Sequence, residues 1–337
     1  MRRTTLLAFS TFALAAAHAS AATLEVGVGQ AFTTLPAAAV AARDGDTVNI
    51  HPGTYAQGAI WYANRLTLQA SAGAKLGAVV IKGTVGNKGV FEIKGDDATV
   101  VGLDFQYARS TDGNGAGIRS EGHNITVSNC EFFANEIGML ITANVGHQGG
   151  FVTLDSSVFD LSGTTVAGHI GHAFYANYVG SVRVTNSTFT RGSIGHYIKS
   201  RALTTYVHNN VVDDTNGSAS YLINVPQGGA ADIQNNVLIK GARAANCCIA
   251  ISYGEEMYKG GVYVNAPGVV LIANNQFTNH VPTRVTFVQN NSIPANPVTL
   301  VTNRLTASSG TIAPLVRAGK VQQLRRLLWA MARVLLG

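Results

Sequence analysis

The feature that most constrains the fold is a stretch that is written twice, in residues 171–212. GHAFYAN at 171–177 is echoed 24 residues later by GHYIKSR at 195–201, and each copy precedes a second similar run, 182–189 and 205–212. Two short β-rich runs in a repeat of this length are typical of one coil of a β-solenoid. Coils stack at the strand spacing of about 4.8 Å. The repeat therefore places side chains of one copy under those of the next: His172 under His196, Tyr175 under Lys199, and Asn177 under Arg201.

A recurring apolar residue extends this pattern over most of the chain. It returns at steps of 23 to 39 residues, at Phe105, Phe132, Phe159, Phe189, Val212, Leu238, Phe277 and Leu305. An asparagine commonly stands three residues earlier, at Asn129, Asn186, Asn209, Asn235 and Asn274. Asparagines that stack in register can hydrogen-bond along the row. Strand alternation in a second run of each coil predicts an outward row of Arg119, Ile141, Tyr175, Lys199, Ile223 and Ile251.

The two ends of the chain differ from the repeats. Residues 1–21 begin with Arg2 and Arg3, continue with a short apolar run and end in small residues, which predicts a secretory signal and a secreted or periplasmic protein. Residues 32–43 predict a helix that caps the first coil. Residues 314–336 predict a basic amphipathic helix, which either caps the last coil or touches a membrane or acidic polymer. The expected division is 1–21, 22–305 for the solenoid and 306–337.

Charge and cysteine content exclude some functions. The net charge is +6, but Arg2, Arg3 and five basic residues after 305 carry it. Residues 22–305 hold 17 basic and 18 acidic residues, a net charge of −1, so we expect no nucleic-acid partner. The three cysteines leave two interpretations open, a bridge from Cys130 to Cys247 or Cys248 and simple packing. No zinc spacing occurs, and we expect a monomer.

Several motifs resemble those of a known superfamily. DGDTV at 44–48, PGTY at 52–55 and the Asn-x-x-Phe coils resemble the right-handed parallel β-helix, pectate-lyase-like superfamily over roughly residues 24–305. The resemblance implies an all-β, right-handed parallel β-helix, and a superfamily of lyases, epimerases and hydrolases of acidic polysaccharides, tailspikes and adhesins. Lys199-Ser200 is similar to the Lys-Ser of chondroitinase-B-like and alginate-lyase-like β-helices, although their arginine lies on a later coil. The aspartate set of polygalacturonase-type hydrolases is incomplete here.

The predicted ladder of side chains suits removal of a proton next to a carboxylate. A cation must neutralise that carboxylate while a base takes the proton and an acid protonates the leaving oxygen. Arg201 is the predicted neutraliser because its planar fork pairs with carboxylates. Lys199 is the predicted base, since Arg201 beside it disfavours the ammonium form, with His196 as the alternative. Tyr175 is the predicted acid.

The remaining candidates would bind substrate. His172 and Asn177 are predicted to bind sugar hydroxyls, and Arg119, Tyr253 and Glu255 to lie at the rim. No metal ligands or cofactor are predicted, although Glu255-Glu256 leaves calcium open. The chemistry predicts a lyase or C5-epimerase acting on an acidic polysaccharide. Two alternatives stay open, a non-catalytic glycan-binding surface protein and a hydrolase that uses acids such as Asp213 and Asp214.

Overall fold

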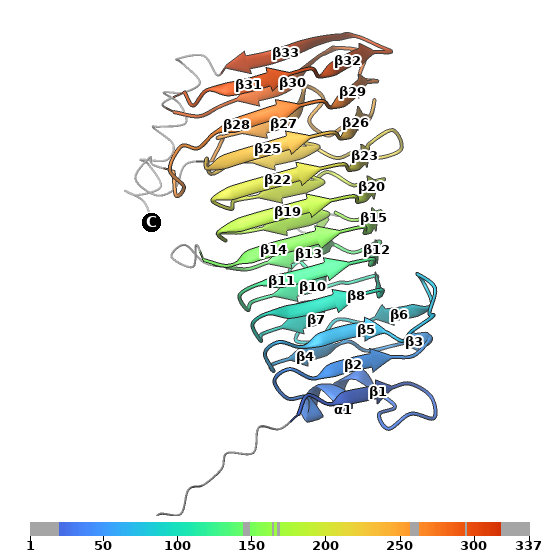
Figure 1. Ribbon diagram of the computed structural model, residues 1–337. Coiled ribbons are helices and arrows are strands. Elements are labelled where there is room, and N and C mark those ends of the chain that lie inside the picture. The colour runs from blue at the N-terminus through green and yellow to red at the C-terminus, as the bar shows by residue number, and fades with distance from the viewer. Residues whose placement is uncertain are drawn as a thin grey trace, which may run out of the picture.

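The computed structural model of the chain describes residues 20–143, 149–163, 165–166, 169–256, 263–293 and 295–317. These residues form a stack of coils in which each coil contributes one strand to each of three parallel sheets (Figure 1). A two-stranded antiparallel hairpin projects from the stack, β16 (Thr165–Val166) and β17 (His169–Ile170). The parallel β-helix predicted from the repeats is therefore confirmed.

The strands of the three sheets follow one another in chain order along the stack. The first sheet holds β1 (Thr23–Val26), β2 (Thr47–Ile50), β5 (Thr67–Ala70), β8 (Ala98–Val101), β11 (Ile125–Ser128), β14 (Phe151–Asp155), β19 (Ser181–Thr185), β22 (Thr204–His208), β25 (Ala230–Gln234), β28 (Val270–Ala273) and β31 (Val298–Val301). The second sheet holds β3 (Gly53–Tyr55), β6 (Val79–Lys82), β9 (Asp104–Gln106), β12 (Glu131–Phe133), β15 (Val158–Asp160), β20 (Thr188–Thr190), β23 (Val211–Asp213), β26 (Val237–Lys240), β29 (Gln276–Asn279) and β32 (Arg304–Ala307). The third sheet holds β4 (Ala59–Trp61), β7 (Gly89–Ile93), β10 (Ala116–Ser120), β13 (Ile137–Ile141), β18 (Phe174–Ala176), β21 (Ile198–Ser200), β24 (Ile223–Val225), β27 (Ile249–Tyr253), β30 (Arg284–Asn290) and β33 (Thr311–Arg317).

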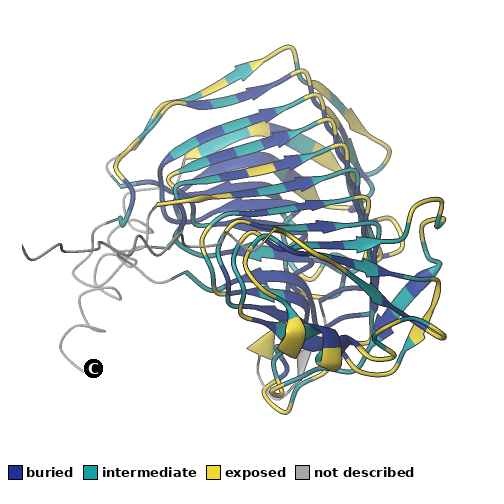
Figure 2. Ribbon diagram, turned by 60° about the horizontal axis from the view of Figure 1, so that its bottom comes forward, coloured by how far each residue is buried: buried dark blue, intermediate teal, exposed yellow. Residues whose placement is uncertain are grey.

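The core fills the space between the sheets with stacked apolar side chains. Figure 2 shows buried residues alternating with less buried ones along the stacked strands. The predicted apolar row pairs in register along the second sheet, from Phe105 through Val212 to Leu305. The rings of Phe132 and Phe159 lie 4.3 Å apart and nearly parallel. Each coil thus buries its apolar residue directly on that of its neighbour.

The predicted asparagine row is wrong by one residue. Asn209, Asn235 and Asn274 have φ of 57–60°, a left-handed conformation that asparagine tolerates better than most residues. The amide ladder consists of the residues that follow such turns, Ser157, Ser187, Asn210, Asn236, Asn275 and Asn303. Each side chain after Ser157 accepts a hydrogen bond from the backbone N–H of the member on the preceding coil, as Asn236 Oδ1 does from Asn210 N at 2.9 Å.

The predicted outward row on the third sheet is partly wrong. Arg119, Tyr175 and Lys199 do share one row, but Leu140, Asn224 and Ser252 occupy the other places. Ile141, Ile223 and Ile251 face the core and are at most 2% exposed. A slip of one residue moves a strand's side chains to the other face. Here apolar residues stand on both faces of β13, so the sequence shows no alternation that fixes its register.

The two ends agree with the predictions only in part. Helix α1 (Leu35–Ala41) is shorter than expected, and Leu35 and Ala38 pack into the core beside β1 and β4. At the other end β33 continues the third sheet, so the predicted helix does not begin at Pro314, and strands of the solenoid extend beyond 305. The rest of that helix, and residues 1–19 of the predicted signal, lie outside the described residues. In the described part of the chain, no helix has the length and apolarity needed to cross a membrane.

Candidate functional site

The candidate site lies on the outer face of the third sheet, where three neighbouring side chains from β18 and β21 converge. Strand pairing puts Tyr175 beside Lys199, as the repeat predicted. Arg201 follows β21 directly, and its guanidinium reaches back over the preceding coil. It donates hydrogen bonds to the Tyr175 hydroxyl and, at 2.9 Å, to Asn177 Oδ1. We call Tyr175, Asn177, Lys199 and Arg201 the cation ladder.

Glu256 joins the two cations, and sequence reasoning did not give it this place. It belongs to the loop after β27, and its carboxylate accepts a hydrogen bond from Lys199 Nζ at 2.8 Å and another from Arg201 Nε at 2.8 Å. Burial opposes its ionisation, but the charges of Lys199 and Arg201 outweigh burial and hold the pKa of Glu256 below its usual value. Two cations therefore converge on one carboxylate.

Tyr175 packs beneath both positive charges. Lys199 Nζ and the Arg201 guanidinium carbon each lie 5.2 Å from the centre of its ring, within range for a cation–π interaction. Burial is the main reason that the pKa of Tyr175 is raised to about 12, while Arg201 opposes the shift. The hydroxyl therefore stays protonated at neutral pH. Since Arg201 can only donate, the Tyr175 O–H is left to donate to another group.

The two histidines stack beside this ladder but are committed to the backbone. The rings of His172 and His196 lie 4.8 Å apart, and the ring of Tyr221 follows 4.6 Å from His196. Nδ1 of His172 accepts from the His196 N–H at 2.9 Å, and Nδ1 of His196 accepts from the Tyr221 N–H at 3.2 Å. Both rings are therefore neutral, and burial is the main cause that lowers the pKa of each well below its usual value, with the charges of Lys199 and Arg201 adding to the shift. This arrangement counts against His196 as the base, because its one acceptor nitrogen is already occupied.

The predicted rim residues do not gather at the site. Arg119 shares the outward row, but Leu140 separates it from Tyr175, and it pairs with Glu121 at 3.1 Å. The rim prediction for Tyr253 is wrong, because its side chain is 2% exposed and its hydroxyl donates to Gly229 O. Tyr253 stands two residues after Ile251 on β27, so it faces the core as Ile251 does. Glu255 lies next to the site but turns toward Asn224 and Ser252, and burial raises its pKa.

Oxygen atoms near Glu255 are the part of this site that could hold a cation. Asn224 and Ser252 contact its carboxylate, and Asn291 donates to Ser252 Oγ at 3.1 Å. Oxygen ligands of this kind suit calcium. Among the described residues no three His, Cys, Asp or Glu side chains group as metal ligands, and calcium stays the open alternative that the sequence left it. Away from the site, Cys247 and Cys248 form a disulfide with each other, and Cys130 is buried as a free thiol.

Comparisons with known proteins find only distant structural similarity. No family model matches the chain, and no curated protein matches it. A solved PL6 family alginate lyase, AlyGC, is 15% identical with a TM-score of 0.45 over 89% of this chain and 40% of that one. Pectin methylesterase PemA from Erwinia chrysanthemi is 10% identical with a TM-score of 0.45, over 93% and 98%. The rice weevil pectin methyl esterase is 11% identical with a TM-score of 0.43, over 90% and 91%. The chain thus spans about two fifths of the lyase's length.

Proposed function

We propose that the chain is an exported carbohydrate-active β-helix protein that removes a proton from uronic-acid units of an acidic polysaccharide, as a lyase or a C5-epimerase. One observation carries this proposal: Lys199 and Arg201 both hold the carboxylate of Glu256. That carboxylate stands in for the carboxylate of a uronate. A bound uronate would displace it and place its own C5–H bond beside Lys199.

Three of the four ladder residues then carry one step each. Arg201 stabilises the charge that develops on the uronate carboxylate. Lys199, once freed from Glu256, acts as the base and takes the C5 proton, and the electron pair of the C5–H bond forms a C4–C5 double bond. The C4–O bond breaks, and the Tyr175 hydroxyl gives its proton to the leaving oxygen. In an epimerase the C4–O bond stays intact and a proton returns to C5 from the opposite face.

The test is ultraviolet absorbance of the conjugated uronate that elimination creates. The full chain would be incubated with a panel of uronic-acid polysaccharides, with and without calcium. We expect Lys199→Ala to reduce the rate at least about 1,000-fold, in the range for loss of a base or of charge stabilisation. Lys75→Ala, which changes an exposed lysine on a distant loop, is the matched control. A rate that Lys199→Ala leaves unchanged would contradict the assignment.

A non-catalytic glycan-binding protein is the second candidate, and one observation favours it. Lys199 is only 7% exposed and is already ion-paired, so the ladder as it stands offers no free base. A binder would hold oligouronates without product and without exchanging their C5 proton for solvent deuterium. The hydrolase alternative has less support, since Asp214 is fully enclosed and bound to Tyr197, out of reach of a polymer.

A further inference from the structure

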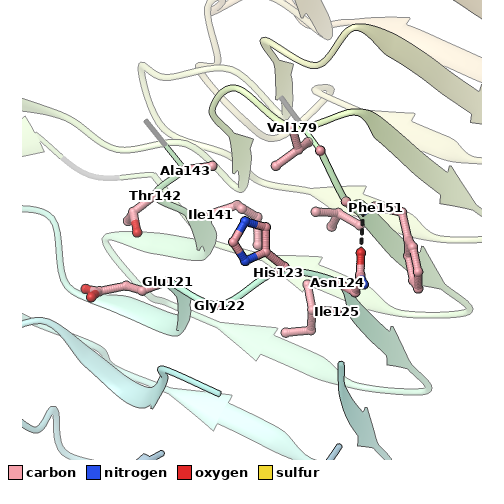
Figure 3. A pocket seen from close by; sticks show the side chains of 13 residues that line it. Glu121, Gly122, His123, Asn124, Ile125, Ile141, Thr142, Ala143, Phe151 and Val179 are labelled. Atoms are coloured by element: carbon pink, nitrogen blue, oxygen red, sulfur yellow. Dashed lines mark hydrogen bonds between the residues drawn. The ribbon is translucent and has the colours of Figure 1, made fainter. Parts of the chain in front are cut away.

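A hollow of about 280 Å³ lies at the corner where the third sheet turns into the first. Its walls come from three successive coils, and the imidazole of His123 stands at its centre in Figure 3. Small-molecule sites usually measure about 300–1,000 Å³. At about 280 Å³ the hollow lies just below that range, so it can accept one sugar unit but not several.

The lining combines one exposed aromatic side chain with a few polar groups. Phe151 is 44% exposed at the start of β14, whereas Ile125, Ile141 and Val179 border the hollow with side chains that are at most 6% exposed. An aromatic ring of this kind can pack against the C–H face of a pyranose. Asn124 is already fixed, since its Oδ1 accepts from the Phe151 N–H at 2.9 Å (Figure 3). This bond fixes the backbone of Phe151 relative to Asn124 on one side of the hollow.

Charge decides which sugar fits. Glu121 is the one formally charged side chain among the described residues of the lining. Burial opposes its ionisation, but the hydrogen bonds and charges of Lys94 and Arg119 outweigh burial and lower the pKa of Glu121. Its carboxylate is already held by Lys94 Nζ at 2.6 Å and Arg119 Nε at 3.1 Å, so the described part of the lining adds no unpaired cation that could receive the carboxylate of a uronate. A neutral sugar therefore suits the hollow better than a uronate does.

Residues that line the hollow stand close in sequence to residues of the candidate site. Val179, which lines it, stands two residues after Asn177, which bonds to Arg201. On an earlier coil Glu121 bonds to Arg119, which shares the outward row with Tyr175 and Lys199. A polymer that places a uronate on the cation ladder would therefore pass beside the opening of this hollow.

We propose that the hollow binds a neutral sugar unit of the same polymer, so that the substrate is a mixed polysaccharide in which neutral sugars adjoin or branch from uronates. This inference rests on the proposed function, because the cation ladder supplies the uronate subsite.

The test is calorimetric titration of the full chain with two tetrasaccharides, one made only of uronates and one in which uronates alternate with a neutral hexose. We expect the alternating tetrasaccharide to bind more tightly. Phe151→Ala should weaken its binding about tenfold, as expected for losing about 1.4 kcal/mol of contact, and leave the all-uronate tetrasaccharide within about twofold. Tyr62→Ala, which removes an aromatic side chain that is 69% exposed elsewhere, is the matched control.

The outcomes separate this inference from the proposed function. If Phe151→Ala changes neither titration while Lys199→Ala abolishes both, the neutral-sugar subsite is contradicted and the proposed function is supported. If Phe151→Ala weakens the alternating tetrasaccharide but Lys199→Ala has no effect on either binding or product, the subsite stands and the function falls. If the native chain binds neither tetrasaccharide, both are overturned.

Discussion

The amide ladder and the cation ladder use the same stacking of coils in opposite ways. In the amide ladder neighbouring coils bind one another: Asn275 Oδ1 accepts from the side-chain Nδ2 of Asn236 at 2.9 Å and from its backbone N–H at 3.0 Å. In the cation ladder Lys199 and Arg201 stand two residues apart on one coil, and both bind Glu256 from a loop more than 50 residues further along the chain.

The difference follows from charge. Amides both donate and accept, so identical residues on successive coils satisfy one another. Two cations only donate and repel each other, so they require an anion from elsewhere, and a half-buried anion that other anions can replace makes a binding site. In a solenoid, a row of polar side chains whose charges and hydrogen bonds are not met within the row is therefore the place to look for a binding or catalytic site.

The first prediction removes one member of the amide ladder. Asn236→Ala leaves the buried N–H of Asn210 without its acceptor and Val207 O without its donor. We expect the free energy of unfolding to fall by about 3 kcal/mol, while activity per folded molecule is unchanged. Urea titration measures the loss. Asn235→Gly changes the neighbouring exposed residue at φ 58°, which glycine adopts freely, and should be near neutral. Equal losses in both variants would contradict the ladder's role.

Sequence alone predicted which side chains stack in the cation ladder, but it did not predict the carboxylate of Glu256 that pairs with them. The echo of GHAFYAN in GHYIKSR was enough to place Tyr175 beside Lys199 and His172 beside His196, because in-register stacking follows directly from the repeat. Glu256 could not be placed, because a loop of irregular length brings it back. The asparagine row failed by one residue, since the turn needs asparagine and so does the ladder after it. Only the backbone conformation tells the two apart.

The second prediction separates the two ladders by pH. His172 and His196 stay neutral in the fold, with pKa values well below their usual value. The unfolded chain takes up these protons below about pH 6.5 and the folded chain does not, so stability falls as the pH drops. The slope is up to about 1.4 kcal/mol per pH unit for each ring. Unfolding titrations between about pH 7.5 and about pH 5, on either side of the usual histidine pKa of about 6.5, measure this slope.

Two variants, one in the histidine stack and one in the amide ladder, provide the control for this pH dependence. In the double variant His172→Asn, His196→Asn, an amide oxygen can replace each Nδ1 acceptor without titrating, so the slope should become shallower. Asn236→Ala should instead lower the whole curve by the same amount at every pH, because no member of the amide ladder titrates. If the double variant keeps the full slope, the acid sensitivity arises outside the histidine stack.

The third and smallest prediction tests whether the anion of the cation ladder is replaceable. Glu256→Gln keeps the size of the side chain but removes the charge that competes with a uronate for Lys199 and Arg201. We expect an oligouronate to bind about tenfold more tightly, a gain of about 1.4 kcal/mol. Glu255→Gln, the neighbouring carboxylate that bonds to Asn224 and Ser252 instead, should change affinity little. Weaker binding in Glu256→Gln would show that Glu256 helps to hold the ligand. Glu256 would then be a permanent partner of the cation ladder and not one that a ligand replaces.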